Sequence, residues 1–185
     1  PLLSVPDLRA VAKACQQVGA ALAVDATFPS PYGQRALSLG ADYAIQSPTK
    51  WLKGHSDALA GTVSGSRERM APLRSLRLMA GDVLGPFEAW LTQRGLRTLP
   101  VRMKAHLEQA AHVARRLAES PLLERVYYPG LPSHPHHAVA REVLEGGFGP
   151  MVAFEIQGAG RSECFRVLEA LKVARGFPGL VGMDL

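Results

Sequence analysis

The sequence predicts an α/β protein in two parts. Residues 1–102 are expected to form a layered domain with a largely parallel sheet, and residues 103–185 a smaller α+β domain. Two observations predict this class. In the first part, short apolar stretches alternate with helical patterns, which is typical of a parallel sheet covered by helices. After Pro121 the pattern changes, and the alternating stretch 151–156 is typical of a half-buried strand.

The first part is expected to begin with a helix over residues 6–18, since Asp7 suits a first helical turn and Gly19 ends the pattern. Strands are then expected at residues 20–24, 43–46 and 58–64, and further helical segments at 35–39 and 67–79. The first two strands lead directly to Asp25 and Ser47. Functional groups in parallel sheets gather at the carboxyl ends of strands, so these two positions are candidates for a site.

The second part is entered through a long helix over residues 86–120, which we expect to be interrupted near Pro100. A domain boundary is expected near Arg102. The remaining pattern predicts strands at residues 126–128 and 151–156 and helices at 137–145 and 161–171.

The composition is that of a globular protein: of 185 residues, 47% are hydrophobic and 20% charged. No apolar run approaches a membrane span, and Cys15 and Cys164 are too far apart in the chain to suggest a disulfide framework. We therefore expect a cytoplasmic protein without a membrane partner. The net charge of +5 is compatible with attraction of anions or with ordinary surface arginine, and we favour surface arginine because no dense basic block occurs. No nucleic-acid partner is expected, since no binding motif accompanies the charge.

The run SPTKWLKGHSD, from Ser47 to Asp57, is the most informative stretch. It places Lys50 beside Thr49 and Ser47 just after an expected strand, while Asp25 follows the preceding strand. A lysine, a distant aspartate and small hydroxyls at strand ends are what a pyridoxal phosphate (PLP) enzyme requires. In such an enzyme the lysine forms a Schiff base, the aspartate keeps the pyridine nitrogen protonated, and the hydroxyls bind the phosphate.

Together with VDATF at residues 24–28, this run resembles the trans-sulfuration, or Cys/Met-metabolism, family of PLP enzymes, whose usual wording is VDNTF and SATKYxGGHSD. That family includes cystathionine γ-synthase, the cystathionine lyases, methionine γ-lyase and the O-acylhomoserine sulfhydrylases. Further similar stretches are PFEAWL at 86–91, RGLRTLPVRM at 94–103, YYPGLPSHP at 127–135 and GGFG at 146–149. The resemblance implies the second half of a PLP aminotransferase-like (fold type I) large domain, followed by part of a smaller α+β C-terminal domain.

The resemblance also implies residue roles. Lys50 is expected to be the catalytic residue and to bind PLP covalently, and Asp25, Ser47 and Thr49 are expected to bind the cofactor. For Thr27 two roles stay open, one structural and one beneath the cofactor ring.

Two residues depart from the family wording: Ala26 stands where Asn is usual, and Pro48 where a small residue such as Ala is usual. A residue before proline is pushed towards extended geometry, which can shift the hydroxyl of Ser47.

The reaction implied is elimination or replacement at Cβ or Cγ of cystathionine, methionine or an O-acylhomoserine, in a homodimer or dimer of dimers (a homotetramer). The family's glycine-rich phosphate turn and ring-stacking aromatic precede its VDNTF run, and its carboxylate-binding arginine follows the segments matched here. Because none of these is identified in the sequence, we expect an internal piece of a longer enzyme that is inactive alone. A truncated relic that folds or associates without turnover and a phosphate-binding module are the alternative hypotheses.

The last residues suggest a change of reading frame. One G inserted into codons for Arg-Val-Ser-Leu-Gly yields Arg-Gly-Phe-Pro-Gly, as at residues 175–179. Genuine divergence explains the same residues equally well.

Histidines are the remaining candidates for a site. His134, His136 and His137 cluster, but their spacing fits no standard zinc pattern and no cysteine accompanies them, so no metal is expected. His55 is expected to order the turn after the lysine, and Trp51 to pack.

Overall fold

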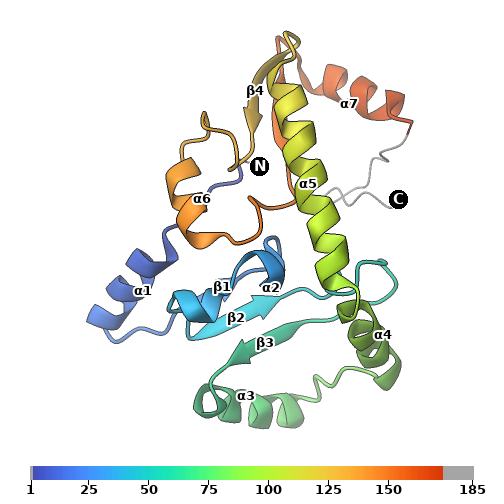
Figure 1. The fold of residues 1–185 in the computed structure, drawn as a ribbon. Coiled ribbons are helices and arrows are strands. Elements are labelled where there is room, and N and C mark those ends of the chain that lie inside the picture. The colour runs from blue at the N-terminus through green and yellow to red at the C-terminus, as the bar shows by residue number, and fades with distance from the viewer. Residues whose placement is uncertain (1, 173–185) are drawn as a thin grey trace.

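The computed structural model describes residues 2–172. Within them the helices are α1 (Leu8–Gln17), α2 (Ser30–Gly33), the 3₁₀ helix η1 (Ala36–Leu39), α3 (Arg67–Ala80), α4 (Pro86–Leu96), α5 (Leu99–Ala118), α6 (His137–Val143) and α7 (Arg161–Ala170). The strands are β1 (Ala23–Asp25), β2 (Tyr43–Gln46), β3 (Thr62–Gly65), β4 (Leu123–Tyr127) and β5 (Ala153–Ile156). The first three strands form one sheet, and β4 and β5 form another. The long α5 extends from the region of the first sheet to β4 in the second (Figure 1).

The first sheet is mixed rather than largely parallel. Strand β1 runs parallel to β2, with Asp25 opposite Ile45, whereas β3 runs antiparallel to β2. A parallel third strand needs a crossover connection, usually a helix. Residues 47–61, which join β2 to β3, contain turns and bends but no helix. The chain therefore returns beside β2 in the opposite direction.

One hydrophobic core lies between the first sheet, α1, η1 and α6. Its buried members come from both parts of the chain: Leu8, Ala26, Ala36, Leu39, Ala41 and Val143. The connection continues in the backbone, where the amide of Glu145 donates to the carbonyl of Gly33 at 2.8 Å. Helix α6 therefore packs on the first part of the molecule, although it lies more than thirty residues beyond Arg102 in the chain.

Helix α5 contributes to two further cores. Its first half buries Leu99, Met103 and Leu107 against Tyr32 and Trp51. Its second half buries Ala110 and Ala114 against Tyr128 and Leu131. Arg102, near which we expected a domain boundary, lies inside this helix, and the position of the boundary stays a prediction.

The expected break in the long helix occurs at Arg97 and Thr98, between α4 and α5. Pro100 sits in the first turn of α5, where its missing N–H and fixed φ are tolerated. The short α2 was not expected from the sequence, and β3 begins at Thr62, later than the expected strand at residues 58–64.

Helices α3 and α4 carry exposed apolar side chains. No residue of α3 is buried, and Leu78, Met79 and Phe87 are 68%, 80% and 63% exposed. Phe87 stacks on Trp90, with the ring centroids 5.9 Å apart. Exposed apolar side chains gathered in this way are typical of a surface that another chain segment or subunit covers.

Candidate active site at the ends of two parallel strands

The candidate site lies where β1 and β2 end side by side. Because these strands are parallel, Asp25 and Ser47 emerge at the same edge of the sheet. The ladder continues past the strands, since the amide of Ala26 donates to the carbonyl of Ile45 at 2.9 Å. One step further, the amide of Ser47 donates to Oγ1 of Thr27, also at 2.9 Å. The buried Thr27 thus joins the two loops, which gives it a structural role, and its role beneath a cofactor ring stays a prediction.

Asp25 is exposed to solvent and oriented by its own loop. The amide of Thr27 donates to Oδ1 of Asp25 at 2.9 Å. This hydrogen bond uses one of the acceptor sites of the carboxylate and leaves the others for a ligand. Asp25 also lines a cavity of about 200 Å³, whose apolar wall includes Phe28 and Phe148.

Lys50 lies on a helical turn that we call the lysine turn, residues 47–54. Its backbone amide donates to the carbonyl of Ser47 at 3.2 Å. The amide of Lys53 donates to Pro48 at 3.0 Å, and the amide of Gly54 to Lys50 at 2.9 Å. Pro48 is fully buried and Lys50 is exposed. The turn thus fixes the backbone of Lys50 and leaves its side chain towards solvent.

The two hydroxyl residues differ in their surroundings. Oγ1 of Thr49 accepts from the amide of Ala60 at 3.4 Å. A hydroxyl that accepts one hydrogen bond can still donate its own proton. Ser47 is half-buried at the start of the turn. An amine, a carboxylate and two hydroxyls at one sheet edge are the groups that PLP requires for its aldehyde, ring nitrogen and phosphate. By this chemistry the residues present fit the cofactor.

Two residues of this region were missed by reasoning from sequence. Lys53 is completely buried, and its ammonium group donates to the carbonyl of Ala58. Arg102 contacts the lysine turn from α5, across 51 residues of chain from Trp51. No local pattern marks either contact. His55, in contrast, was expected to order the turn, and its Nδ1 lies 2.6 Å from the carbonyl oxygen of Lys53.

The clustered histidines contact the backbone. Nε2 of His134 lies 3.1 Å from the carbonyl of Leu2, and Nδ1 of His136 accepts from the amide of Val5 at 3.0 Å. Nδ1 of His137 lies 2.8 Å from the carbonyl of Pro129. Between residues 2 and 172 no group of three His, Cys, Asp or Glu side chains is placed to hold a metal ion.

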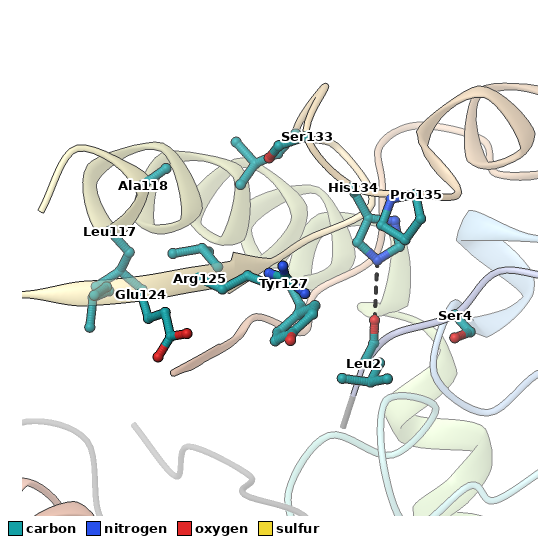
Figure 2. A pocket seen from close by; sticks show the side chains of 13 residues that line it. Leu2, Ser4, Leu117, Ala118, Glu124, Arg125, Tyr127, Ser133, His134 and Pro135 are labelled. Carbon is teal, nitrogen blue, oxygen red and sulfur yellow. Dashed lines mark hydrogen bonds between the residues drawn. The ribbon is translucent and has the colours of Figure 1, made fainter. Parts of the chain in front are cut away.

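A larger cavity, of about 650 Å³, lies away from the strand ends. Figure 2 shows it between the end of α5, strand β4 and the segment around His134, with Arg125 and Tyr127 in its wall. Its lining includes none of the four candidate residues Asp25, Ser47, Thr49 and Lys50. Of these four residues, only Asp25 lines the smaller cavity.

Comparison with known proteins agrees with this chemistry. The model of the family described as Cys/Met metabolism PLP-dependent enzyme matches residues 1–180. O-succinylhomoserine sulfhydrylase of Pseudomonas aeruginosa is 42% identical over 173 residues, which cover 94% of this chain and 42% of that protein. Cystathionine γ-lyase of Dictyostelium discoideum is 44% identical over 160 residues, which cover 86% of this chain and 41% of that protein.

Solved structures show the same likeness. The crystal structure of cystathionine γ-synthase from Xanthomonas oryzae, in complex with aminoacrylate and cysteine, superposes with a TM-score of 0.93 at 39% identity. The match covers 98% of this chain and 47% of that one. The chain thus spans about half the length of the relatives it matches.

These findings confirm the expected fold class and, at the level of the family, the expected cofactor, PLP. Among the described residues no helix is long and apolar enough to cross a membrane. The suggested frame change at residues 175–179 lies outside the described residues. Since the family model matches nearly the whole chain, the protein belongs to the Cys/Met metabolism family of PLP-dependent enzymes.

Proposed function

We propose that this chain carries the catalytic lysine and the pyridinium partner of an enzyme that eliminates or replaces a group at Cβ or Cγ of an amino acid. The observation that supports this most is the placement of the lysine turn beside Asp25, at two strand ends joined through Thr27 and Ser47. The parallel strands thus bring two loops of the sequence, the one that follows β1 and the lysine turn, to the same edge of the sheet.

Each residue has a role that follows from its position. When bound, PLP supplies an electron sink that stabilises negative charge at the substrate Cα. The carboxylate of Asp25 would accept from the ring N–H, and its charge would keep that nitrogen protonated. The amine of Lys50 would hold the cofactor covalently and, when free, would act as the base that moves protons between Cα and Cβ of the substrate. The hydroxyls of Ser47 and Thr49 would donate to the phosphate.

The substrate class is proposed from the relatives. Their names include O-succinylhomoserine sulfhydrylase, cystathionine γ-lyase and cystathionine β-lyase. We infer a sulfur-containing amino acid or an activated homoserine as substrate. Because these enzymes act at different bonds, the class includes both β- and γ-chemistry.

The proposal is tested by locating the covalent cofactor. Full-length protein is incubated with PLP, reduced with borohydride, digested and analysed by peptide mass spectrometry. We expect the reduced adduct on Lys50 and not on the other lysines: Lys13, Lys53, Lys104 and Lys172. Absence of an adduct at Lys50 contradicts the proposal. If phosphate compounds still bind, the outcome supports a phosphate-binding module, and if nothing binds, it supports a relic.

We further propose that the enzyme assembles as a homodimer or dimer of dimers, and that residues 1–185 alone lack turnover. The exposed apolar surface of α3 and α4 supports assembly, and the exposure of Asp25 and Lys50 supports inactivity, since catalysis needs a site that excludes water. Light scattering and a cystathionine cleavage assay on the 185-residue chain check both. A monomer of 19.9 kDa with turnover above that of free PLP contradicts them.

A cytoplasmic location is also proposed, in line with the free thiols of Cys15 and Cys164. Fractionation of cells that express the full-length protein tests this, and recovery outside the cytoplasm contradicts it.

A further inference from the structure

The lysine turn leaves backbone acceptors at its carboxyl end. Helical turns end in carbonyls without intrahelical partners, and a cationic side chain placed there stabilises them. Here the partner is Arg102 of α5. Its Nη1 donates to the carbonyl of Trp51 at 2.7 Å, and its Nη2 donates to the carbonyl of Leu52 at 3.3 Å.

The same guanidinium also contacts the end of α4. Nη2 of Arg102 donates to the carbonyl of Gly95 at 2.8 Å, and Nε donates to Oγ1 of Thr98 at 3.0 Å. One planar group with donors in a fixed fork thus connects the lysine turn, the end of α4 and the first turn of α5. An ammonium group cannot match this geometry, because it presents its donors from a single point.

Two glycines make room for this contact. Gly54 has a φ of +73°, and a Cβ at that position would collide with the guanidinium of Arg102. A Cβ at Gly95 would lie 2.6 Å from both the Cα and the carbonyl oxygen of Lys53. The close approach of α4 and Arg102 therefore depends on the absence of side chains at both positions.

Trp51, which follows Lys50, contacts α5 through its side chain as well as through its carbonyl. Trp51 packs on the buried face of α5, and its ring centroid lies 5.1 Å from that of His106. Burial, and secondarily the charge of Arg102, lower the pKa of His106, which favours the uncharged form of the ring beside Arg102. Helix α5 therefore fixes both the carbonyl and the side chain of Trp51.

We propose that Arg102 is the positioning residue for Lys50: it holds the lysine turn in the orientation that presents the amine to the cofactor. Arg102 does not itself touch substrate or cofactor in this role. The inference rests on the proposed function of Lys50. Loss of Arg102 leaves two turn carbonyls without their charged donor, so the turn samples other orientations and the amine reaches the cofactor aldehyde less often.

The test compares Arg102→Met, Arg102→Lys and Arg97→Met in the full-length protein. Arg97 is an exposed arginine at the end of α4 and serves as the matched control. The measurements are the rate of PLP attachment to Lys50, trapped by borohydride, and the pH midpoint of the visible absorbance of the bound cofactor. Circular dichroism shows whether each variant is folded. The pH midpoint of the absorbance depends on the surroundings of the Lys50 nitrogen. A general loss of stability does not shift this midpoint.

For Arg102→Met we expect attachment slowed by about tenfold or more, and a shifted midpoint. Arg102→Lys is expected to restore part of the rate, and Arg97→Met to match the wild type. A folded Arg102→Met with wild-type rate and midpoint overturns the positioning role, whereas a wild-type protein without an adduct overturns the proposed function itself. If Arg102→Met does not fold, Arg102→Lys and Thr98→Val decide the question. Thr98→Val removes the contact with Nε of Arg102 and the hydrogen bond that Oγ1 of Thr98 donates to the carbonyl of Gly95 at 3.2 Å. Wild-type values in both variants overturn the role.

Discussion

Replacing Lys50 by alanine is expected to lower kcat/KM of the full-length enzyme by about 10³-fold or more, the largest effect of any single change. The substitution removes both the covalent attachment and the base that moves protons at the substrate, and positioned general acid–base groups alone contribute about 10²–10⁴-fold. Steady-state kinetics with cystathionine and with an O-acylhomoserine measure the loss. An added primary amine is expected to restore part of the rate, because it replaces the missing base.

Lys104→Ala is the control for this experiment, since Lys104 is exposed on α5. The control is expected to keep wild-type kinetics. A Lys50→Ala enzyme whose kcat/KM stays within about tenfold of the wild type shows that another group is the base.

The second large effect is expected for Asp25→Asn, which should lower kcat by about 10²–10³-fold while attachment of the cofactor to Lys50 continues. The amide oxygen of Asn can still accept from the amide of Thr27, so the loop keeps its contact. Only the negative charge is lost, and with it the group that holds the ring nitrogen in its protonated form.

Single-turnover kinetics and the borohydride adduct separate the two steps for Asp25→Asn. Asp82→Asn removes an exposed charge between α3 and α4 and serves as the control. Equal turnover in Asp25→Asn and Asp82→Asn assigns the pyridinium contact to a different residue.

The sequence predicts those features of the fold that depend on neighbouring residues. The helix expected at residues 6–18 is α1, for which Asp7 is the N-cap and accepts from the amide of Ala10. The strand ends at Asp25 and Ser47 were also placed correctly, because a short apolar stretch followed by a polar residue is a local signal.

Features that depend on distant residues could not be predicted in the same way. The antiparallel β3 follows from the lack of a crossover helix in residues 47–61, a signal present in the sequence but outweighed by the expectation of a parallel sheet. The contact of Arg102 with Trp51 joins segments 51 residues apart, and burial of Lys53 contradicts the usual preference of lysine for solvent. Both are set by tertiary packing.

The contacts of the histidine cluster have a consequence for synthesis on the ribosome. Val5 hydrogen-bonds a residue 131 positions later, and Val143 completes the core that Leu8 and Ala26 begin. While the chain emerges, the apolar side chains of this core, such as Leu8 and Ala26, stay uncovered until α6 has left the exit tunnel. At typical rates of about 5–20 residues per second, synthesis from Ala26 to Val143 takes about 6 to 23 seconds. We therefore expect chaperones that bind nascent chains to meet this protein before α6 closes the core.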